Sequence, residues 1–357
     1  MAKYVLQKIG YALLTLFGVV TVIFILFAIL PGDPARMMLG QNENAEQLAN
    51  VKKKYGFDKP ISKQYLYYIN DLAPLSFHST NAEDYTFRSN GKYSAAHLFT
   101  IGAIDVVIKW PYLRASFQKN GKEVSAVIKE TLPNTFVLAI SAIVIAMFLG
   151  IFLGILSVLF KDGWVDKLIQ LVSTFGMSVP SFFSAIIFAW LFGYVLHEYT
   201  NLNMTGSLYE VDDFGNGTYI QWKNIILPAV VLGIRPLAVV TQLMRNSLLE
   251  VLSQDYIRTA KAKGLSFWKI IKRHALKNSL NPVVTAISGW FASMLAGAVF
   301  VEYIFGWNGL GKEIVDALNT LDLPIIMGAV LVIASLFIVI NIFVDIIYGW
   351  LDPKVRT

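Results

Sequence analysis

The sequence has no cysteine, few histidines and few charged residues. Asp, Glu, Lys and Arg make up 15% of its 357 residues, whereas soluble globular domains carry about 25%. The absence of cysteine excludes disulfide bonds, thiolate metal ligands and a cysteine nucleophile. No pair of histidines shows a ligand spacing such as His-x-x-x-His, so no metal site is expected. The four histidines are His78, His97, His197 and His274.

Long apolar runs predict an integral membrane protein with six membrane-spanning helices. Apolar residues make up 55% of the chain, and several runs reach the roughly 20 residues that cross a bilayer. The first run exceeds the roughly 7–15 apolar residues of a signal peptide, so we interpret it as an uncleaved span. The runs cover residues 9–30 and about 133–160, 168–197, 225–244, 283–301 and 325–350.

Between these runs the chain divides into polar regions of different length. Residues 31–122 are mostly polar, with short helices expected near 45–55 and 62–72 and no periodic pattern as far as about residue 120. We interpret them as a loop or small subdomain outside the membrane. The remaining divisions are the N-terminal tip and first span 1–30, the membrane core 123–350 with the polar loop 245–282, and the tail 351–357.

The distribution of Lys and Arg predicts the orientation in the membrane. The net charge is +6, which we assign to cytoplasmic segments rather than to nucleic-acid binding, because cytoplasmic loops collect positive charge. Segments on the side of the termini hold fourteen Lys and Arg, against Lys223 and Lys312 in the short loops of the other side. Both termini and the loop 245–282 are therefore predicted to be cytoplasmic. The fourteen are Lys3, Lys8, Lys161, Lys167, Arg245, Arg258, Lys261, Lys263, Lys269, Lys272, Arg273, Lys277, Lys354 and Arg356.

The loop 245–282, called the basic segment below, predicts two helices. The fourth span is expected to continue as a helix to Gly264, where glycine can take the left-handed conformation that ends a helix. Ser266 is a good N-cap for the next helix. On a helical wheel, Phe267, Ile270, Ile271, His274 and Ala275 share one face, and Lys269, Lys272, Arg273 and Lys277 share the other. An amphipathic helix on anionic lipid is one interpretation of this pattern.

A different interpretation comes from the stretch Asp255–Gly264. It resembles the cytoplasmic coupling loop of ABC transporter permeases of the dipeptide, oligopeptide and nickel importer family. Arg258-Thr259-Ala260 stands where the wider superfamily has Glu-Ala-Ala, and Arg-Thr-Ala is typical of the peptide branch. Further matching segments are Pro31–Pro34, Tyr55–Pro60 with Gln64-Tyr65, Leu227–Gly233, Leu295–Ala298 with Glu302, Phe305–Gly311, Asp322–Pro324, Asn341–Tyr348 and Asp352-Pro353. The family usually has Pro where Asn308 stands.

The resemblance implies a type I ABC importer permease fold, with an extracytoplasmic subdomain between helices 1 and 2, in a bacterial inner membrane. It implies a B-type peptide permease that pairs with a homologous permease, two cytoplasmic ATPases and an extracytoplasmic peptide-binding protein. ATP and Mg would be bound by the ATPases, so this chain would be no enzyme, bind no cofactor and hold no metal. The residues implied in ATPase coupling are Asp255, Tyr256, Arg258, Thr259, Ala260, Lys261 and Gly264.

Other functions remain open from the sequence. Relatives also carry nickel chelates or glutathione. A secondary transporter driven by an ion gradient would show repeated halves and several ionisable residues inside its spans. The sequence has one such residue, Arg235, which we interpret as a candidate for the transport pathway. The stretch Gly306–Lys312 stops one residue short of a P-loop because Glu313 replaces the required Ser or Thr.

Overall fold

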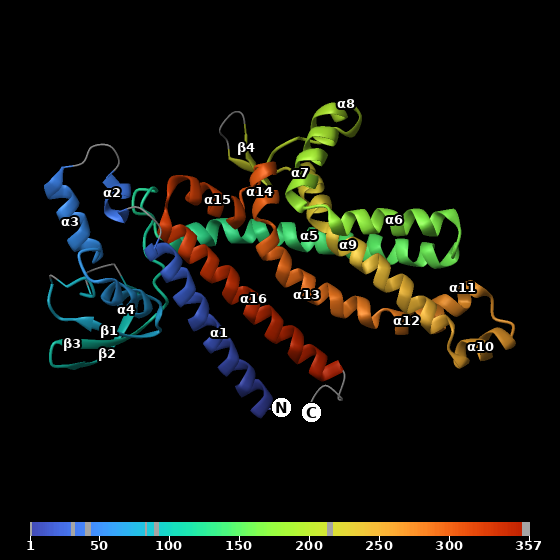
Figure 1. Ribbon diagram of the computed structural model, residues 1–357, viewed down its shortest axis with the longest axis horizontal. Coiled ribbons are helices and arrows are strands. Elements are labelled where there is room, and N and C mark those ends of the chain that lie inside the picture. The colour runs from blue at the N-terminus through green and yellow to red at the C-terminus, as the bar shows by residue number, and fades with distance from the viewer. Residues whose placement is uncertain are drawn as a thin grey trace. The chain divides into compact units, whose positions relative to one another are not determined.

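The computed structural model describes residues 2–29, 33–39, 44–82, 84–88, 93–212 and 217–351. It separates into two compact units, Met1–Glu130 with Asp316–Ser335 and Thr131–Val315 with Leu336–Thr357. Most of the regular elements are helices, as predicted (Figure 1). Residues 31 and 32 of the predicted turn, and residues 352–357 of the predicted tail, lie outside the described residues.

The first unit begins with the long apolar helix α1, Ala2–Ile29. Two short helices lie where the sequence predicted them, α3 (Ala45–Tyr55) and α4 (Ile61–Leu72), after the brief α2, Pro34–Leu39. Helix α3 has strong end signals. The Asn44 side chain accepts a hydrogen bond from the Glu46 N–H, and Gly56 closes the helix with a φ of 71°.

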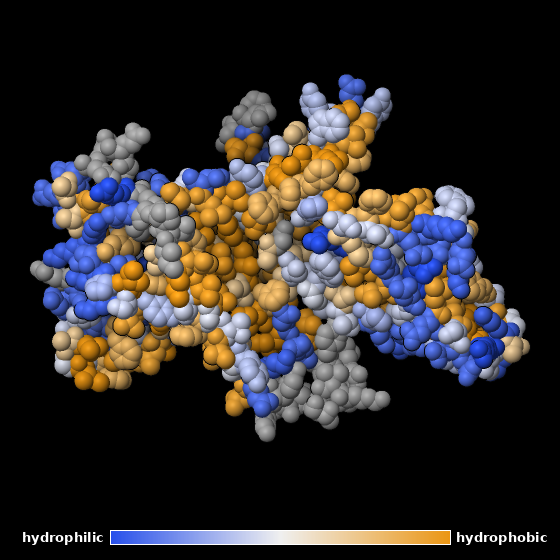
Figure 2. Space-filling view, in the orientation of Figure 1, coloured by the Kyte–Doolittle hydropathy of each residue, from blue (hydrophilic) through white to orange (hydrophobic). Residues whose placement is uncertain are grey.

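The first unit also contains a sheet that the sequence did not reveal. Strands β1 (Leu75–Ser79), β2 (Ala95–Ile101) and β3 (Ile104–Lys109) form an antiparallel sheet in the order β1-β3-β2. One face, with Ser76 and His78, is buried, while apolar side chains of the other face are exposed and gather over β2 and β3 (Figure 2). Strand β3 has two adjacent buried valines, Val106 and Val107, and β2 is exposed from Ala96 to Ile101, so neither strand shows the regular alternation that predicts a strand.

The second unit is built on α5 (Val124–Leu159) and α9 (Lys223–Leu252), two long helices that also meet the criteria for membrane spans. The predicted lead-in at 123–132 and the predicted span 133–160 form this single helix α5, with Pro133 inside it. Two glycines of α5 lie against α9. A β-carbon on Gly150 would lie 2.6 Å from Val240, and one on Gly154 would lie 2.6 Å from Met244. The small residues therefore permit close approach of the two helices.

Two of the predicted spans are bent. The predicted span 168–197 consists of α6 (Trp164–Ser178) and α7 (Ser181–Trp190), which turn by 111° at Pro180, followed by a π-helical turn η1, Leu191–Val195. The predicted span 283–301 consists of α13 (Asn281–Gly297) and α14 (Val299–Phe305), bent by 57°. The described residues therefore contain four straight candidate spans, or up to six if each bent pair crosses the membrane once.

Short elements join the spans of the second unit. Helix α8 (His197–Thr200) and strands β4 (Tyr209–Val211) and β5 (Thr218–Ile220) lie between η1 and α9. The last two helices, α15 (Leu310–Thr320) and α16 (Leu323–Leu351), each begin in one unit and end in the other. Helix α16 corresponds to the predicted span 325–350, with nearly the same bounds.

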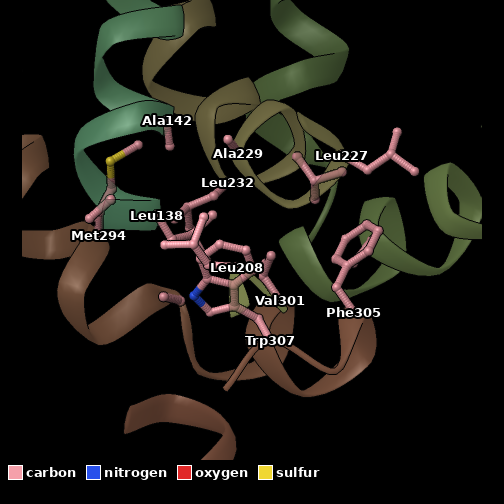
Figure 3. Packing of buried hydrophobic residues seen from close by; sticks show 14 of the residues in the cluster. Leu138, Ala142, Leu208, Leu227, Ala229, Leu232, Met294, Val301, Phe305 and Trp307 are labelled. Carbon is pink, nitrogen blue, oxygen red and sulfur yellow. The ribbon is translucent and has the colours of Figure 1, made fainter. Parts of the chain in front are cut away.

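The core of the second unit is formed by side chains from α5, α7, α9, α13 and α14. Trp307 is completely buried at its centre, beside Leu138, Leu208 and Val301 (Figure 3). Its indole N–H donates to the Asn134 carbonyl oxygen at 3.0 Å. This single aromatic side chain fixes the loop after α14 to the start of the membrane-spanning part of α5.

Candidate functional site

Helix α10 (Asp255–Ala262) is a short polar helix held on apolar anchors. Ile257 is completely buried and Ala260 is nearly so. Both belong to a cluster with Val158 of α5 and Met244 and Leu248 of α9. Because eight residues make a helix that is marginal in water by itself, this apolar contact is what holds α10 in place.

The opposite face of α10 is exposed and polar. The Asp255 and Arg258 side chains are 94% and 75% exposed and lie 3.2 Å apart, and the Thr259 hydroxyl donates to the Asp255 carbonyl oxygen. The Tyr256 hydroxyl accepts from the Asn278 side-chain amide at 3.0 Å. Lys261 is exposed as well. Six of the seven predicted coupling residues thus lie on one short helix, five of them on its exposed face and Ala260 on its anchored face.

Gly264 ends this helix as predicted. Its φ is +76°, in the left-handed region, and its N–H donates to the Lys261 carbonyl oxygen at 2.9 Å. The Leu265 N–H reaches back to the Ala260 carbonyl oxygen at 3.3 Å. The turn redirects the chain into α11, Phe267–Ile270, which begins after Ser266. The predicted cap is only partly correct, because the Ser266 backbone is extended but its side chain makes no capping hydrogen bond.

The predicted continuous helix from the fourth span to Gly264 is wrong. Helix α9 ends at Leu252, and the Ser253 hydroxyl donates to the Glu250 carbonyl oxygen at 2.7 Å, which competes with the next helical hydrogen bond. Gln254 is extended and starts α10 as a separate helix. Two breaks, at Ser253-Gln254 and at Gly264, therefore flank the candidate coupling helix.

The predicted second helix is also interrupted. After α11 the chain forms a π-helical turn η2 (Ile271–Ala275) and then α12, Leu276–Ser279. A π turn holds more residues per turn than an α-helix, so a helical wheel assigns the residues of this turn to the wrong face. His274 is exposed rather than on the buried face, and so is Phe267. The cationic side chains lie outside as expected, and Figure 2 shows a hydrophilic surface over α10 to α12. They are Lys269, Lys272, Arg273 and Lys277.

A buried ion pair behind this surface was missed by the sequence reasoning. The Arg245 guanidinium on α9 donates to both carboxylate oxygens of Asp166 on α6, at 2.8 and 2.7 Å. The Ser157 hydroxyl of α5 and the Asp162 N–H also donate to that carboxylate. From the sequence, Arg245 contributes only to the distribution of positive charge that predicts the orientation in the membrane. Its partner lies 79 positions away, and no local pattern connects the two.

The loop after α14, residues 306–311, is held by a buried carboxylate. Glu302 is fully buried, and its Oε2 accepts from the Gly311 N–H at 2.6 Å and the Lys312 N–H at 3.2 Å. It therefore binds the positive end of α15. Gly309 lies so close that an added β-carbon would be 2.3 Å from this carboxylate. The near P-loop at this position thus encloses a glutamate, which leaves no room for a phosphate.

The predicted pathway residue Arg235 lies in the middle of α9. Its side chain is exposed on the isolated chain, while the adjacent Pro236 is buried. Within the described residues it has no hydrogen-bond or ion-pair partner. It lies apart from the α10 surface, so the structure does not bring the two groups of predicted site residues together. A cation at such a position in a membrane-spanning helix is by default a candidate for a paired or functional role.

Comparisons with known proteins identify the family of this chain. Residues 146–357 match the model of the family described as binding-protein-dependent transport system inner membrane component. Residues 1–82 match the model described as the N-terminal part of a binding-protein-dependent transport system membrane component. The chain is 31% identical over its full length to the dipeptide transport system permease protein of Alkalihalophilus pseudofirmus, all of which is covered. It is 30% identical over its full length to that of Bacillus subtilis, with 98% covered.

The chain therefore belongs to the family of binding-protein-dependent transport system inner membrane components. It is a multi-pass membrane protein and a permease of the ABC importer type. Among solved structures, a methionine ABC transporter in inward-facing conformations has a TM-score of 0.46 and 16% identity. The match covers 65% of this chain and 96% of that chain.

Proposed function

We propose that this chain is the B-type permease of an ATP-driven importer of short peptides. The full-length similarity to permeases named for dipeptide transport supports the cargo, since it extends through the N-terminal region that precedes the common membrane core. The proposal includes a second, homologous permease, two ATPases and an extracytoplasmic peptide-binding protein as partners. ATP and Mg bind to the ATPases, and this chain neither binds nor hydrolyses ATP.

The main observation in support of the proposal is that α10 has one exposed polar face and one apolar face buried against membrane-spanning helices. Its polar face, with Asp255, Tyr256 and Arg258, is exposed, while Ile257 and Ala260 fix the helix to α5 and α9. A displacement of α10 is therefore passed directly to membrane-spanning helices, whereas a flexible loop would absorb it. We infer that α10 contacts an ATPase on the cytoplasmic side, where both chain termini also lie.

The basic surface on α11 to α12 gives the competing proposal of a lipid-bound helix. Anionic lipid would contact the cations of this surface together with apolar side chains on the same side. Ile270, Ile271 and Ala275 are instead buried within the chain. Apolar contact with lipid at these three positions is therefore excluded, and Phe267 and Trp268 of α11 are the exposed apolar side chains left for such contact.

The deciding experiment is purification of the tagged full-length chain from its own cells in mild detergent. We expect a second permease and an ATPase to co-purify in fixed proportion. An Arg258→Glu chain should lose the ATPase and keep the second permease, whereas Lys277→Glu, an equal charge change on α12, should keep both. A chain that purifies alone and transports peptide in liposomes without ATP would overturn the proposal in favour of a secondary transporter.

We further infer that Arg235 lines the transport pathway, because it is exposed on the isolated chain and lacks a partner among the described residues. Arg235→Ala should lower the maximal rate of peptide uptake at least about tenfold if the cation contacts cargo during passage. Gln242→Ala, seven positions further on α9, is the matched control. Uptake kinetics that are unchanged in Arg235→Ala, at equal amounts of membrane-inserted protein, would exclude an essential role in the pathway.

A further inference from the structure

The first unit encloses a cavity of about 330 Å³ that the transport function does not explain. All of its lining residues belong to this unit, and they come from α1, α3, α4, the segment before α5, the first turns of α16, and Asp33 and Phe57 in the short connections between helices. Most of the wall is apolar, including Phe24, Phe27, Phe57 and Phe117. Its size is at the lower end of the range for sites of small molecules, which are concave, mostly apolar and carry a few polar groups.

Arg114 is one of these polar groups, and its backbone is strained. Its φ of 66° lies in the left-handed region, which residues with a β-carbon rarely adopt. The Nε–H donates to Asp71 at 2.9 Å, and the guanidinium lies over the rings of Tyr68 and Tyr85. Within the described part of the chain, the two terminal nitrogens of the guanidinium have no hydrogen-bond partner. Arg114 thus contributes to the lining a guanidinium whose terminal nitrogens are unused among the described residues.

Tyr68 is the second unexplained polar group in the lining. Its side chain is 3% exposed, and its hydroxyl is buried without a hydrogen-bond partner among the described residues. Buried hydroxyls in folded proteins nearly always have a partner, so an orphan is a sign of a missing ligand or water. Burial raises the pKa of Tyr68 to about 12. The hydroxyl therefore keeps its proton and is available as a hydrogen-bond donor.

The polar groups of the lining that lack a partner among the described residues are hydrogen-bond donors. Lys52 and Arg114 are cationic, and Asp33 is the one carboxylate that lines the cavity. Asp33 is already paired with Lys52 at 2.6 Å, while Asp71, the partner of Arg114, is not in the lining. Each cation of the lining is thus paired with a carboxylate, and the cavity presents unused guanidinium donors, a phenolic donor and aromatic walls.

We propose that this cavity binds a small amphipathic anion, with its carboxylate on Arg114 and Tyr68 and its apolar body between the phenylalanine side chains. A guanidinium and a hydroxyl together match the two oxygens of a carboxylate. Two sources have this chemistry, the C-terminus of a short peptide with an apolar side chain and a fatty acid from the membrane. The proposal concerns a site separate from α10 and does not depend on ATPase coupling.

The test measures binding to the purified full-length chain in nanodiscs of phosphatidylcholine. Equilibrium dialysis uses two radiolabelled probes, alanyl-phenylalanine and dodecanoate. Tyr68→Phe removes only a hydroxyl without a partner, so the fold should not be weakened. We expect Tyr68→Phe to weaken binding by about tenfold or more, the effect of losing a hydrogen bond to a charged group. Tyr67→Phe, the adjacent tyrosine outside the cavity lining, should leave binding unchanged.

The outcome with each probe identifies the source of the ligand. Saturable binding of alanyl-phenylalanine that Tyr68→Phe weakens supports a peptide site, and the same result with dodecanoate supports a fatty-acid site. Arg114→Lys, which keeps the charge but loses the planar fork, should weaken the same probe. The proposal is overturned if neither probe saturates, or if Tyr68→Phe and Tyr67→Phe bind alike. Because no ATPase is present, failure here leaves the proposed transport function untouched.

Discussion

The Asp166–Arg245 pair ties α6 to α9. Both side chains are largely buried, at 2% and 15% exposure, and they share two hydrogen bonds. Asp166→Asn keeps the size of the side chain but leaves a buried guanidinium without its counter-charge. We expect a loss of about 3–5 kcal/mol of stability, typical of breaking one side of a buried pair. The midpoint of thermal unfolding of the purified chain measures the loss.

Asp162→Asn is the matched control, because Asp162 is an exposed carboxylate of the same turn. Its φ of 64° is left-handed, a conformation that Asn tolerates well. We expect its unfolding midpoint to stay close to that of the parent chain. Equal shifts for Asp166→Asn and Asp162→Asn would contradict the structural role given to the pair.

Lys109 predicts an unusual dependence of stability on pH in the first unit. Its ammonium group is buried, donates to the Asp71 carbonyl oxygen and lies 5.4 Å from the centre of the Tyr93 ring. Burial lowers the pKa of Lys109 to about 8. Above that pH the folded chain holds fewer protons at this site than the unfolded chain, so stability should rise between about pH 8 and 10, by at most about 1.4 kcal/mol per pH unit.

Above about pH 10 the buried tyrosines act in the opposite direction. Burial raises the pKa of Tyr112 to about 12, so the unfolded chain ionises first and stability falls. Lys109→Met should remove the rise in stability between pH 8 and 10, because methionine has no titrating group. The variant leaves no unpaired carbonyl, since the Asp71 carbonyl oxygen still accepts from the Tyr112 N–H at 2.8 Å. Hydrogen exchange of peptides from the sheet, corrected for the intrinsic pH effect, gives the measurement. Equal pH profiles for the two chains would refute the assignment.

Gly264 determines where α10 ends. A β-carbon there would meet no atom within 4 Å, so space is not the constraint, whereas the φ of +76° is. Gly264→Val forces a β-branched residue into the left-handed region, at a cost of about 1–3 kcal/mol, or unwinds the turn. We expect this change to displace α10, to reduce ATPase co-purification at least about tenfold and to stop peptide uptake.

Gly264→Asn is the control that separates the effect of side-chain size from the effect of backbone conformation. Asn is larger than Gly but adopts left-handed backbone angles at little cost. This chain should retain most of its ATPase co-purification and uptake. If the Asn and Val chains fail alike, a side chain at this position blocks the ATPase directly, and the turn geometry is not the reason.

The helical elements differ in how far the sequence predicted them. Helices α3 and α4 and the glycine turn at 264 were predicted because local signals, such as the left-handed glycines 56 and 264, decide them. The break at Ser253 was not predicted, because the apolar spacing continues through it to anchor Ile257. The 111° bend at Pro180 was predicted only as an interruption, since a proline marks a break without giving its angle.

The distribution of charges predicts the orientation of the whole chain in the membrane, and the lack of cysteine makes this orientation measurable. Any thiol label on a single-cysteine chain reports only the introduced site. Tyr199, which is 87% exposed, lies in a loop predicted to be outside, and Lys161 is exposed in a turn predicted to be cytoplasmic. A membrane-impermeant maleimide should label Tyr199→Cys in intact spheroplasts and Lys161→Cys only after permeabilisation.

Two further chains complete this topology measurement. Lys263→Cys, after α10, should behave as Lys161→Cys does, because both are assigned to the ATPase side. The parent chain should stay unlabelled under all conditions. Labelling of Lys263→Cys in intact spheroplasts would place α10 on the wrong side of the membrane and would refute its proposed contact with an ATPase.

The sequence by itself determined the membrane class, the approximate spans, the family resemblance and the position of the glycine turn. These follow from apolar run length, charge distribution and local backbone preference, which act over a few residues. Only the tertiary structure decided that Asp166 pairs with Arg245, that Glu302 binds the start of α15 and that Arg114 and Tyr68 line one cavity. Each of these contacts depends on which residues distant in the sequence pack together, and local patterns in one sequence do not show this.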